Sequence, residues 1–271
     1  MLKKAKLCGI IFPVVLKGNS CFAQVFTCAK FMWFEFLGKG MVIYLAYEQA
    51  VSRVEKKYDI STVTASRLNN RLSIALPADS HNREGGYMVR SLYFDTVYSD
   101  DLADKQSGLL CRRKIRLRCY NPDDEIVKLE RKYKNGQYQY KQSLNIKKSE
   151  AISMIKGDYS VLLTMDNAFA KELYAIMTTQ LYRPKVIVEY QRLAFTLEEN
   201  DTRITIDSDI KSTMASFNIF DPNLQMIPSL TSPILEVKYN NFLLDYVKDI
   251  VNITDRIESS ISKYELACNS Y

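Results

Sequence analysis

The chain has 271 residues, enough for one large domain or two small ones, and 47% of them are hydrophobic, so it can bury a sizeable core. Its formal net charge is +6 and its isoelectric point is near 8.8, which fits a polyanionic partner. Neither of the common glycine-rich phosphate-binding loops occurs in the sequence. Any phosphate must therefore be held by side chains.

Metal-binding and nucleophilic motifs are scarce. The six cysteines form no C-x-x-C pair and His81 is the only histidine, so we do not expect a zinc site. His81 lies in a polar stretch from Asp79 to Gly86 that predicts a loop, and we interpret it as a solvated side chain. The cysteines are typical of reduced packing residues in a cytoplasmic protein.

The first forty residues differ in pattern from the rest of the chain. Early lysines precede an apolar run from Leu7 to Leu16, as in a signal peptide, and this run is shorter than the roughly 20 residues that a spanning helix needs. We favour another interpretation, in which translation begins at Met41. The Gly-Lys-Gly before it would be encoded by purine-rich codons, which resemble a bacterial ribosome-binding site. We therefore predict an atypical extension over residues 1–40 and one domain over residues 41–271.

In chain order, the domain is expected to begin with a strand and a helix capped by Ser61 or Thr62. Asn135-Gly136 is a strong turn signal that leads into a further strand over 137–146. The other elements expected up to that turn are a strand over 53–60, the helix to about residue 75, a polar loop over 79–86, a strand over 87–94, a polar connection over 95–108 and a hairpin of strands over 111–120 and 126–134.

The remainder alternates helical and extended patterns. We expect Ser149 to cap a short helix and Asp166 to cap a longer one. Asn200-Asp201 is expected to turn between two strands. The last part should then contain strands over 185–197, 203–208 and 234–239, and a helical pattern from 241 to about 268. This order predicts an α+β fold dominated by antiparallel strands.

One stretch, from Arg112 to Cys119, alternates basic and aliphatic residues. Successive side chains of a strand point to opposite faces. The aliphatic face must be the packed one, so the basic face meets either bulk water or a bound polyanion. The basic face would carry Arg112, Lys114, Arg116 and Arg118, and the packed face Arg113, Ile115, Leu117 and Cys119.

Other predicted strands repeat this arrangement. A single charged strand face is better interpreted as solvated. Several together favour a closed barrel with charged residues inside, helices outside, and a lumen that holds an anion and a cation. The faces in question carry Arg53, Glu55 and Lys57; Lys128, Glu130 and Lys132; Tyr190 and Arg192; Arg203, Thr205 and Asp207; and Glu236 and Lys238.

From about Val51 onward the chain resembles the VTC domain, the polyphosphate polymerase domain of the vacuolar transporter chaperone family, in a stand-alone bacterial form. The resemblance implies the triphosphate tunnel metalloenzyme fold, an antiparallel β-barrel with helices packed outside. It rests on the order and spacing of Arg53-x-Glu55-x-Lys57-Tyr58, Ser91-Leu92-Tyr93-Phe94-Asp95-Thr96, Lys114-x-Arg116-x-Arg118-x-Tyr120, Leu129-Glu130-x-Lys132, Arg183-Pro184, Tyr190-x-Arg192-x-Ala194-Phe195, Arg203-Ile204-Thr205-x-Asp207, Leu235-Glu236-Val237-Lys238 and Ser262-Lys263-Tyr264.

The resemblance also implies site residues. Glu236 matches the carboxylate that holds Mn²⁺ or Mg²⁺, and Glu55 and Glu130 are candidates to assist it. Pairing of Glu130 with Lys132 or Arg118 is an equal alternative. The matching phosphate ligands are Lys57, Arg116, Arg118, Lys132, Lys141, Arg192, Arg203 and Lys263, and we assign Arg53, Lys114, Lys238 and Ser262 to cofactor binding.

The implied activity is transfer of the γ-phosphoryl group of ATP to a polyphosphate chain. Other branches of the superfamily open with E-x-E-x-K, and Arg53 replaces the first of these glutamates, which favours phosphate binding and polymerisation over hydrolysis. A triphosphate hydrolase and a non-catalytic polyphosphate or nucleotide sensor remain alternatives. The expected partners are ATP and polyphosphate, with a membrane-protein partner left open. Nucleic acid is not expected, because the 18 tyrosines are better explained by packing than by base stacking.

Overall fold

The computed structural model describes residues 22–27, 30–37, 40–45, 53–82, 85–136, 138–252 and 257–271. The chain divides into two compact units, Met1–Ser52 and Arg53–Tyr271. The apolar run from Leu7 to Leu16 lies outside the described residues. The first unit contains an antiparallel meander of β1 (Phe22–Thr27), β2 (Lys30–Leu37) and β3 (Gly40–Leu45).

The second unit is built on a ten-stranded sheet in which every pairing is antiparallel. The strands follow one another in space as β13-β4-β12-β10-β9-β5-β6-β7-β8, and β11 pairs with β10. The strands are β4 (Arg53–Asp59), β5 (Tyr87–Thr96), β6 (Cys111–Cys119), β7 (Ile126–Asn135), β8 (Tyr138–Lys147), β9 (Tyr182–Leu197), β10 (Thr202–Thr213), β11 (Ile227–Leu230), β12 (Ile234–Asn240) and β13 (Ile257–Glu258).

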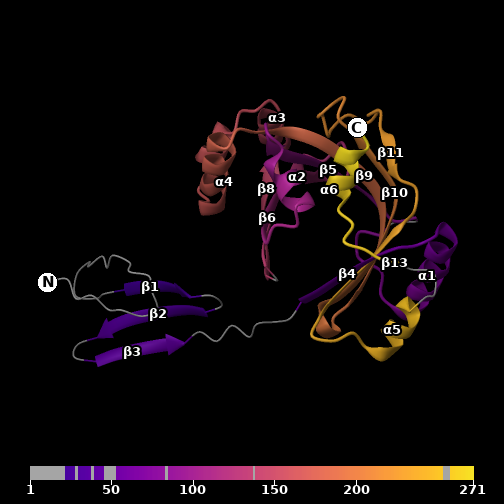
Figure 1. The fold of residues 1–271 in the computed structure, drawn as a ribbon, viewed down its shortest axis with the longest axis horizontal. Helices are drawn as coiled ribbons and strands as arrows, with labels where there is room; N and C mark the ends of the chain where they lie inside the picture. Colours follow the sequence, from indigo (N-terminus) through magenta and orange to yellow (C-terminus); the bar gives the residue numbers. More distant parts are fainter. Residues whose placement is uncertain are drawn as a thin grey trace. The chain divides into compact units, whose positions relative to one another are not determined.

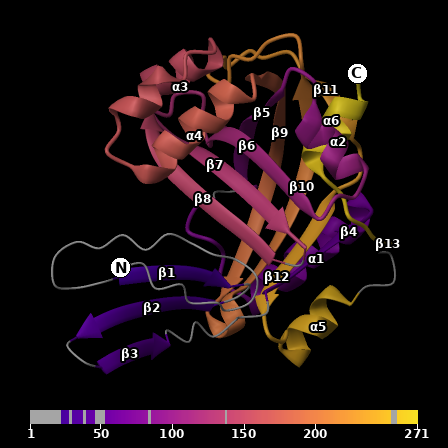
Figure 2. The same ribbon diagram turned by 60° about the vertical axis from the view of Figure 1, so that its left-hand side comes forward.

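Helices cover both halves of this sheet (Figures 1 and 2). Together with the sheet they confirm the predicted α+β class and its antiparallel strands. The helices are α1 (Thr62–Ala75), α2 (Asp100–Gln106), α3 (Lys148–Ile155), α4 (Ala168–Thr179), α5 (Asp245–Val251) and α6 (Lys263–Asn269), and two short 3₁₀ turns are η1 (Ser160–Thr164) and η2 (Glu199–Asp201).

The sheet curls but is not a closed barrel, which corrects the prediction of complete closure. Its end strands β8 and β13 are not paired with each other. A side-chain ion pair, Lys132 Nζ to Glu55 Oε2 at 3.2 Å, joins β7 to β4 across the opening. The segment after β13 lies in the same place, because Lys57 on β4 donates to the Ile261 carbonyl and Lys114 on β6 donates to Ser262. A backbone ladder is thus replaced by side-chain contacts.

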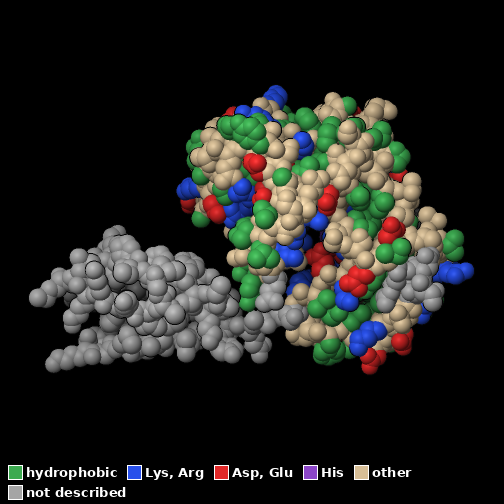
Figure 3. Space-filling model, viewed as in Figure 1, with side chains coloured by type: hydrophobic (Ala, Val, Ile, Leu, Met, Phe, Trp, Pro, Cys, Tyr) green, Lys and Arg blue, Asp and Glu red, His purple; other side chains and the backbone are tan. Residues whose placement is uncertain are grey.

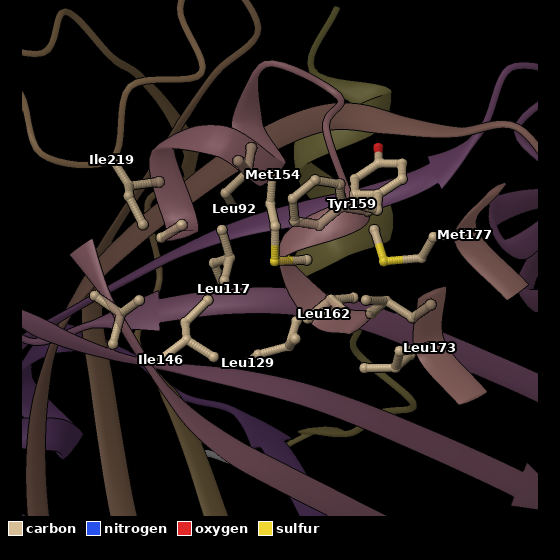
Figure 4. Close-up of a cluster of buried hydrophobic side chains, with 14 of the residues drawn as sticks. Leu92, Leu117, Leu129, Ile146, Met154, Tyr159, Leu162, Leu173, Met177 and Ile219 are labelled. Carbon is tan, nitrogen blue, oxygen red and sulfur yellow. The ribbon is translucent and has the colours of Figure 1, made fainter. Parts of the chain in front are cut away.

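The aliphatic face of the Arg112–Cys119 strand is packed, as predicted. Ile115, Leu117 and Cys119 are fully buried beneath α3, η1 and α4, in a cluster that Figure 4 shows. This cluster contains Leu129 of β7 and Met154 of α3, among others. Burial of each large aliphatic side chain contributes about 1.5–3 kcal/mol.

Two further clusters complete the core. Leu68 and Leu72 of α1 and Val247 of α5 pack on the outer face of β4, β12, β10 and β9. On the inner face, Tyr264 of α6 packs with Val89, alongside residues of β5, β9, β10 and β12. Helix α6 therefore fills part of the space inside the curled sheet, and the rest of that space is left to polar side chains.

Most predicted elements are confirmed, but several boundaries were wrong. The connection over 95–108 contains α2. The caps of α3 and α4 are Lys147 and Asn167 rather than Ser149 and Asp166, and the Asn167 side chain accepts a hydrogen bond from the Ala170 amide. The strand predicted over 137–146 is found at Tyr138–Lys147, residue 137 lying outside the described part of the chain.

Two longer elements also differ from expectation. Strand β10 continues past Ser208 to Thr213, because a bulge with Asp209 at φ 50° lets pairing with β9 resume at Lys211. The helical pattern predicted from 241 to 268 is interrupted. Between α5 and α6, the described chain contains β13, which pairs with β4 instead of continuing a helix.

Candidate functional site

The concave side of the sheet encloses a cavity of about 600 Å³. Figure 3 shows basic and acidic side chains gathered around a hollow in this unit. Twelve lysines and arginines and three glutamates are among its described lining residues. The structure brings all the predicted site residues to this one cavity: Arg53, Glu55, Lys57, Lys114, Arg116, Arg118, Glu130, Lys132, Lys141, Arg192, Arg203, Glu236, Lys238, Ser262 and Lys263.

Strand alternation and register explain how the sequence builds this site. Each lining strand turns alternate residues inward, and the antiparallel register sets charged residues directly opposite one another. Some of these opposed pairs carry opposite charges and others carry like charges. The opposite-charge pairs are Arg116 with Glu130, Arg192 with Asp207, Lys57 with Glu236, and Lys238 with Glu55.

Asp207 is the most deeply buried charged residue of the site, with no exposed side-chain surface. Arg192 contacts it through two hydrogen bonds of 2.6 and 2.7 Å, and Lys263 Nζ lies 2.6 Å from its Oδ2. Burial alone would raise the pKa of the Asp207 carboxyl, but Lys263 and Arg192 hold it below its usual range. Asp207 thus orients two predicted phosphate ligands. Its place on a charged strand face was visible in the sequence, but its role was not predicted.

Glu236 lies among several cations. Its carboxylate is 2.9 Å from Lys238 Nζ, 3.6 Å from Lys57 Nζ and 3.9 Å from Arg192. Burial would raise the pKa of the Glu236 carboxyl, but Lys238 and Lys57 hold it well below its usual range. Glu55, on the neighbouring strand, bonds Lys57 and Lys132 at 3.2 Å each. Glu236 is therefore ionised within this part of the cavity.

Glu130 is also held by cations, in a separate group. Its Oε2 lies 2.8 Å from Arg116 and 3.7 Å from Arg118, and its Oε1 lies 2.5 Å from Lys141. Burial raises and these cations lower the pKa of the Glu130 carboxyl, to about 2. Both carboxylate oxygens are engaged by basic side chains. The sequence allowed Glu130 to pair with Lys132 or Arg118. In the structure Glu130 pairs with Arg118, and also with Arg116 and Lys141. Lys132 pairs with Glu55 instead.

Three lysines form a row of like charges across the sheet. Lys114 lies opposite Lys132, and Lys132 lies opposite Lys141. Like charges directly opposite each other are destabilising. Burial, together with Lys57 and Lys132, lowers the pKa of Lys114 to about 8. A bound polyanion would relieve this repulsion, whereas bulk water would do so only by screening.

Tyr93 of β5 adds a hydroxyl to the site. Its oxygen accepts a 3.0 Å hydrogen bond from Arg116, and its side chain is 6% exposed. Burial raises its pKa, but Arg116, Lys114 and Arg118 outweigh burial and lower it to about 8. The sequence suggested only packing for Tyr93. Its inward direction follows from its position opposite Arg116 in the β5–β6 register.

A second cavity, of about 660 Å³, adjoins the first. It is lined by further basic residues, which include Lys105, Arg112 and Lys134. The sequence placed Arg112 on the basic strand face but gave no reason to expect a second cavity. The two cavities adjoin each other, and both are lined by Glu55, Lys57, Lys114, Lys132, Gln139 and Ser262.

A divalent metal is implied by the family resemblance, and two carboxylates fit it. Among the described residues, no group of three or more His, Cys, Asp or Glu side chains could hold a metal ion by itself. Magnesium-like ions often bind through one or two carboxylates while substrate phosphates supply the other oxygens. Glu236 and Glu55 lie on paired strands, and both carboxylates contact the ammonium group of Lys57. They fit such a shared site better than Glu130, because both Glu130 oxygens are held by short contacts, 2.8 Å to Arg116 and 2.5 Å to Lys141, whereas the contacts of Glu236 are 2.9 to 3.9 Å long.

Comparisons with known proteins define the class. The family model of the VTC domain matches residues 52–271, so the chain belongs to the VTC domain family. Family membership and the cation-lined cavity support a function in binding triphosphate or polyphosphate. The comparison with curated proteins found no match.

Solved structures show more distant similarity. A putative adenylate cyclase from Bacillus halodurans is 16% identical, with a TM-score of 0.42 over 73% of this chain and 87% of that chain. A protein from Pyrococcus horikoshii is 11% identical, with a TM-score of 0.44 over 81% and 99%. A conserved hypothetical protein from Pyrococcus furiosus is 10% identical, with a TM-score of 0.37 over 76% and 95%. Within the described part of this chain, no helix combines the length and apolar character needed to cross a membrane.

Proposed function

We propose that this protein is a polyphosphate polymerase that transfers the γ-phosphoryl group of ATP to the end of a polyphosphate chain. The observation that carries the proposal is the adjacency of two basic cavities, which are both lined by Lys57, Lys114 and Lys132. The first cavity has enough basic lining residues to hold a triphosphate. The second cavity gives a growing chain further basic residues to bind. A triphosphate hydrolase needs to hold only the triphosphate, so the second basic cavity favours the polymerase.

In the proposed reaction, a terminal oxygen of the polyphosphate chain attacks the γ-phosphorus of ATP. The bond from that phosphorus to the β–γ bridging oxygen breaks, and ADP leaves with the electron pair. The chain is longer by one phosphate. Phosphoryl transfer depends mainly on positioning and on stabilising charge.

The side chains of the site supply both requirements. Arginine guanidinium groups bind phosphate oxygens in pairs, and lysines act as point charges. Arg192 is fixed by Asp207 and Arg116 by Glu130, so neither must be ordered when substrate binds. A divalent cation, held by Glu236 with Glu55 and the substrate, would supply positive charge on the leaving side.

The protein is proposed to act in the cytoplasm with ATP and polyphosphate as its partners. The described cysteines, Cys111, Cys119 and Cys268, are free thiols, which is typical of a reducing compartment. A membrane-protein partner outside this chain is compatible with the proposal.

The test is incubation of purified protein with ATP and either Mn²⁺ or Mg²⁺, with the products sized on a gel. Chains longer than tripolyphosphate, formed together with ADP, are the expected result. Orthophosphate as the main product would instead identify a hydrolase. Tight binding of ATP without metal-dependent turnover would identify a sensor.

Arg116→Gln and Arg131→Gln form a matched pair for this assay. Arg116 lines the cavity, whereas Arg131, one position from Glu130 on β7, points to the other face and bonds Glu172 at 2.7 and 2.9 Å. Only Arg116→Gln should reduce chain formation. An equal reduction in both variants would show that the loss comes from the fold rather than from the cavity.

A further inference from the structure

Three aromatic rings cluster at the cavity, and none of them is among the predicted phosphate ligands. His81 and Tyr120 stack with ring centroids 6.2 Å apart and planes inclined by 28°. Tyr87 lies 6.0 Å from His81 and 5.9 Å from Tyr120. The three rings come from the loop before β5, from β5 itself and from the residue after β6. They line the first cavity and not the second.

The cluster is held in place by polar contacts. Asp79, 8% exposed, accepts a hydrogen bond from the His81 amide at 3.0 Å, and its carboxylate lies 2.8 Å from the His81 ring. The same carboxylate pairs with Arg203 at 2.8 Å. Arg203 in turn donates to the Tyr87 hydroxyl at 3.2 Å. The aromatic cluster therefore directly adjoins a predicted phosphate ligand.

Backbone packing also fixes the start of β5. Gly86 has φ +96°, and a Cβ atom there would lie 2.4 Å from the Arg192 carbonyl oxygen. Only glycine allows this close approach, which sets Tyr87 opposite Arg192 in the sheet register. One ring of the cluster and one of the phosphate ligands are thus placed together by the same strand pairing.

The rings are accessible rather than buried. The His81 side chain is 67% exposed, and Tyr87 and Tyr120 are partly exposed. A Lys128 ammonium lies 5.6 Å from the Tyr120 ring centroid, so this end of the cavity combines aromatic faces with positive charge. A chain of phosphates needs the charge but gains nothing from the rings. A nucleotide gains from both, because its base can stack on an aromatic face and its phosphates pair with the positive charge.

We propose that His81, Tyr87 and Tyr120 form a stacking platform for the base of a nucleoside triphosphate, which makes the nucleotide rather than inorganic triphosphate the preferred donor. The proposal rests on the proposed function and specifies its substrate. The base lies at the aromatic cluster, and the triphosphate extends past Arg203 toward Lys57, Lys114 and Lys132. The γ-phosphate thereby points to the boundary with the second cavity, where the acceptor chain ends.

The test compares two ligands that share a triphosphate and differ in the base. Binding of ATP and of tripolyphosphate is measured by isothermal titration calorimetry, at equal ionic strength, for wild type, Tyr120→Leu and His81→Ala. Each substitution should weaken ATP binding about tenfold and change tripolyphosphate binding by less than about twofold. Because His81 is exposed, His81→Ala keeps the test valid if Tyr120→Leu does not fold.

Tyr98→Leu is the matched control. Tyr98 is 80% exposed and lines neither cavity, so its loss should leave both affinities unchanged. Unchanged ATP affinity in both cluster variants, or equal weakening of both ligands, would overturn the platform while leaving the triphosphate site intact. Failure of wild-type protein to bind either ligand would instead overturn the proposed function, and the platform with it.

Discussion

Lys114 on β6 lies directly opposite Lys132 on β7, so two positive side chains stand next to each other on the inner face of the sheet. Lys141 extends this row on β8. The opposite-charge pairs of the same cavity stabilise the sheet, whereas this row destabilises it. The ligand-free protein therefore holds unfavourable charge at the boundary between its two cavities, and the first two predictions follow from it.

Tripolyphosphate should raise the melting temperature of the protein more than sulfate at equal ionic strength, because it binds the folded state alone. Lys114→Gln should raise the melting temperature of the ligand-free protein and reduce the shift that tripolyphosphate causes. Differential scanning fluorimetry measures both. Lys171→Gln, at an exposed lysine of α4, is the control and should change neither. Equal shifts with sulfate and tripolyphosphate would contradict the prediction.

The stability of the ligand-free protein should rise between about pH 8 and pH 10. Burial and neighbouring lysines lower the pKa of Lys114 to about 8 in the folded protein, below its ordinary value of 10.5 in the unfolded chain, so the unfolded chain binds more protons in this range. Tyr93, also lowered to about 8, acts in the same direction. A group with such a shift contributes a slope on the order of 1 kcal/mol per pH unit, and because Lys114 and Tyr93 interact, their contributions do not simply add. Urea unfolding should show a smaller slope in Lys114→Gln and in Tyr93→Phe than in wild type.

Asp207→Asn should destabilise the protein by about 3 kcal/mol, because it leaves Arg192 and Lys263 buried without their carboxylate. Asp209→Asn is a close control on the same strand. Asp209 is exposed and pairs with Lys211 at the surface, so its loss should cost about 0.5 kcal/mol or less. Urea denaturation compares the two variants. Similar losses at both positions would show that Asp207 has no special structural role.

Arg116→Gln should weaken tripolyphosphate binding roughly tenfold or more, because a charge-assisted hydrogen bond contributes about 1.5–3 kcal/mol. Calorimetry measures the affinity. Arg131→Gln should leave it unchanged, since Arg131 bonds Glu172 on the other face of β7. Retention of full affinity in Arg116→Gln would remove Arg116 from the phosphate ligands.

Glu236→Gln should abolish metal-dependent turnover and strengthen metal-free binding of tripolyphosphate, because a negative charge is removed from among Lys57, Lys238 and Arg192. Glu130→Gln should keep the dependence on metal, since both Glu130 oxygens are held by short contacts to Arg116 and Lys141. Turnover is measured against Mn²⁺ concentration for both variants. Metal dependence lost in Glu130→Gln and kept in Glu236→Gln would reverse the assignment.

The sequence predicted the charged faces of the strands well, because side-chain alternation is a local property. Arg116 and Leu117 point to opposite sides of β6 for reasons that neighbouring residues alone determine. Register is not local, so the sequence could not show that Lys114 opposes Lys132 or that Arg192 opposes Asp207. Those pairings depend on turn geometry and on the whole sheet.

Loops and short elements were harder to predict. His81 and Tyr120 lie next to strands rather than within them, and only folding brings them together. Helix α6 follows β13 rather than continuing from α5, because Tyr264 packs inside the sheet and its hydroxyl donates to Asp95. A contact between residues so far apart leaves no periodic signal in the sequence.

The opening between the two ends of the sheet has a consequence for the width of the cavity. A closed barrel has a circumference fixed by its backbone hydrogen bonds. Here the two ends are joined by Lys132 with Glu55, and by the contacts of Lys57 and Lys114 with the chain after β13. Lys57, Lys114 and Lys132 line both cavities, so an anion that binds them competes with the contacts that hold the two ends of the sheet together. We therefore expect the width of this opening to depend on the charge of the bound ligand.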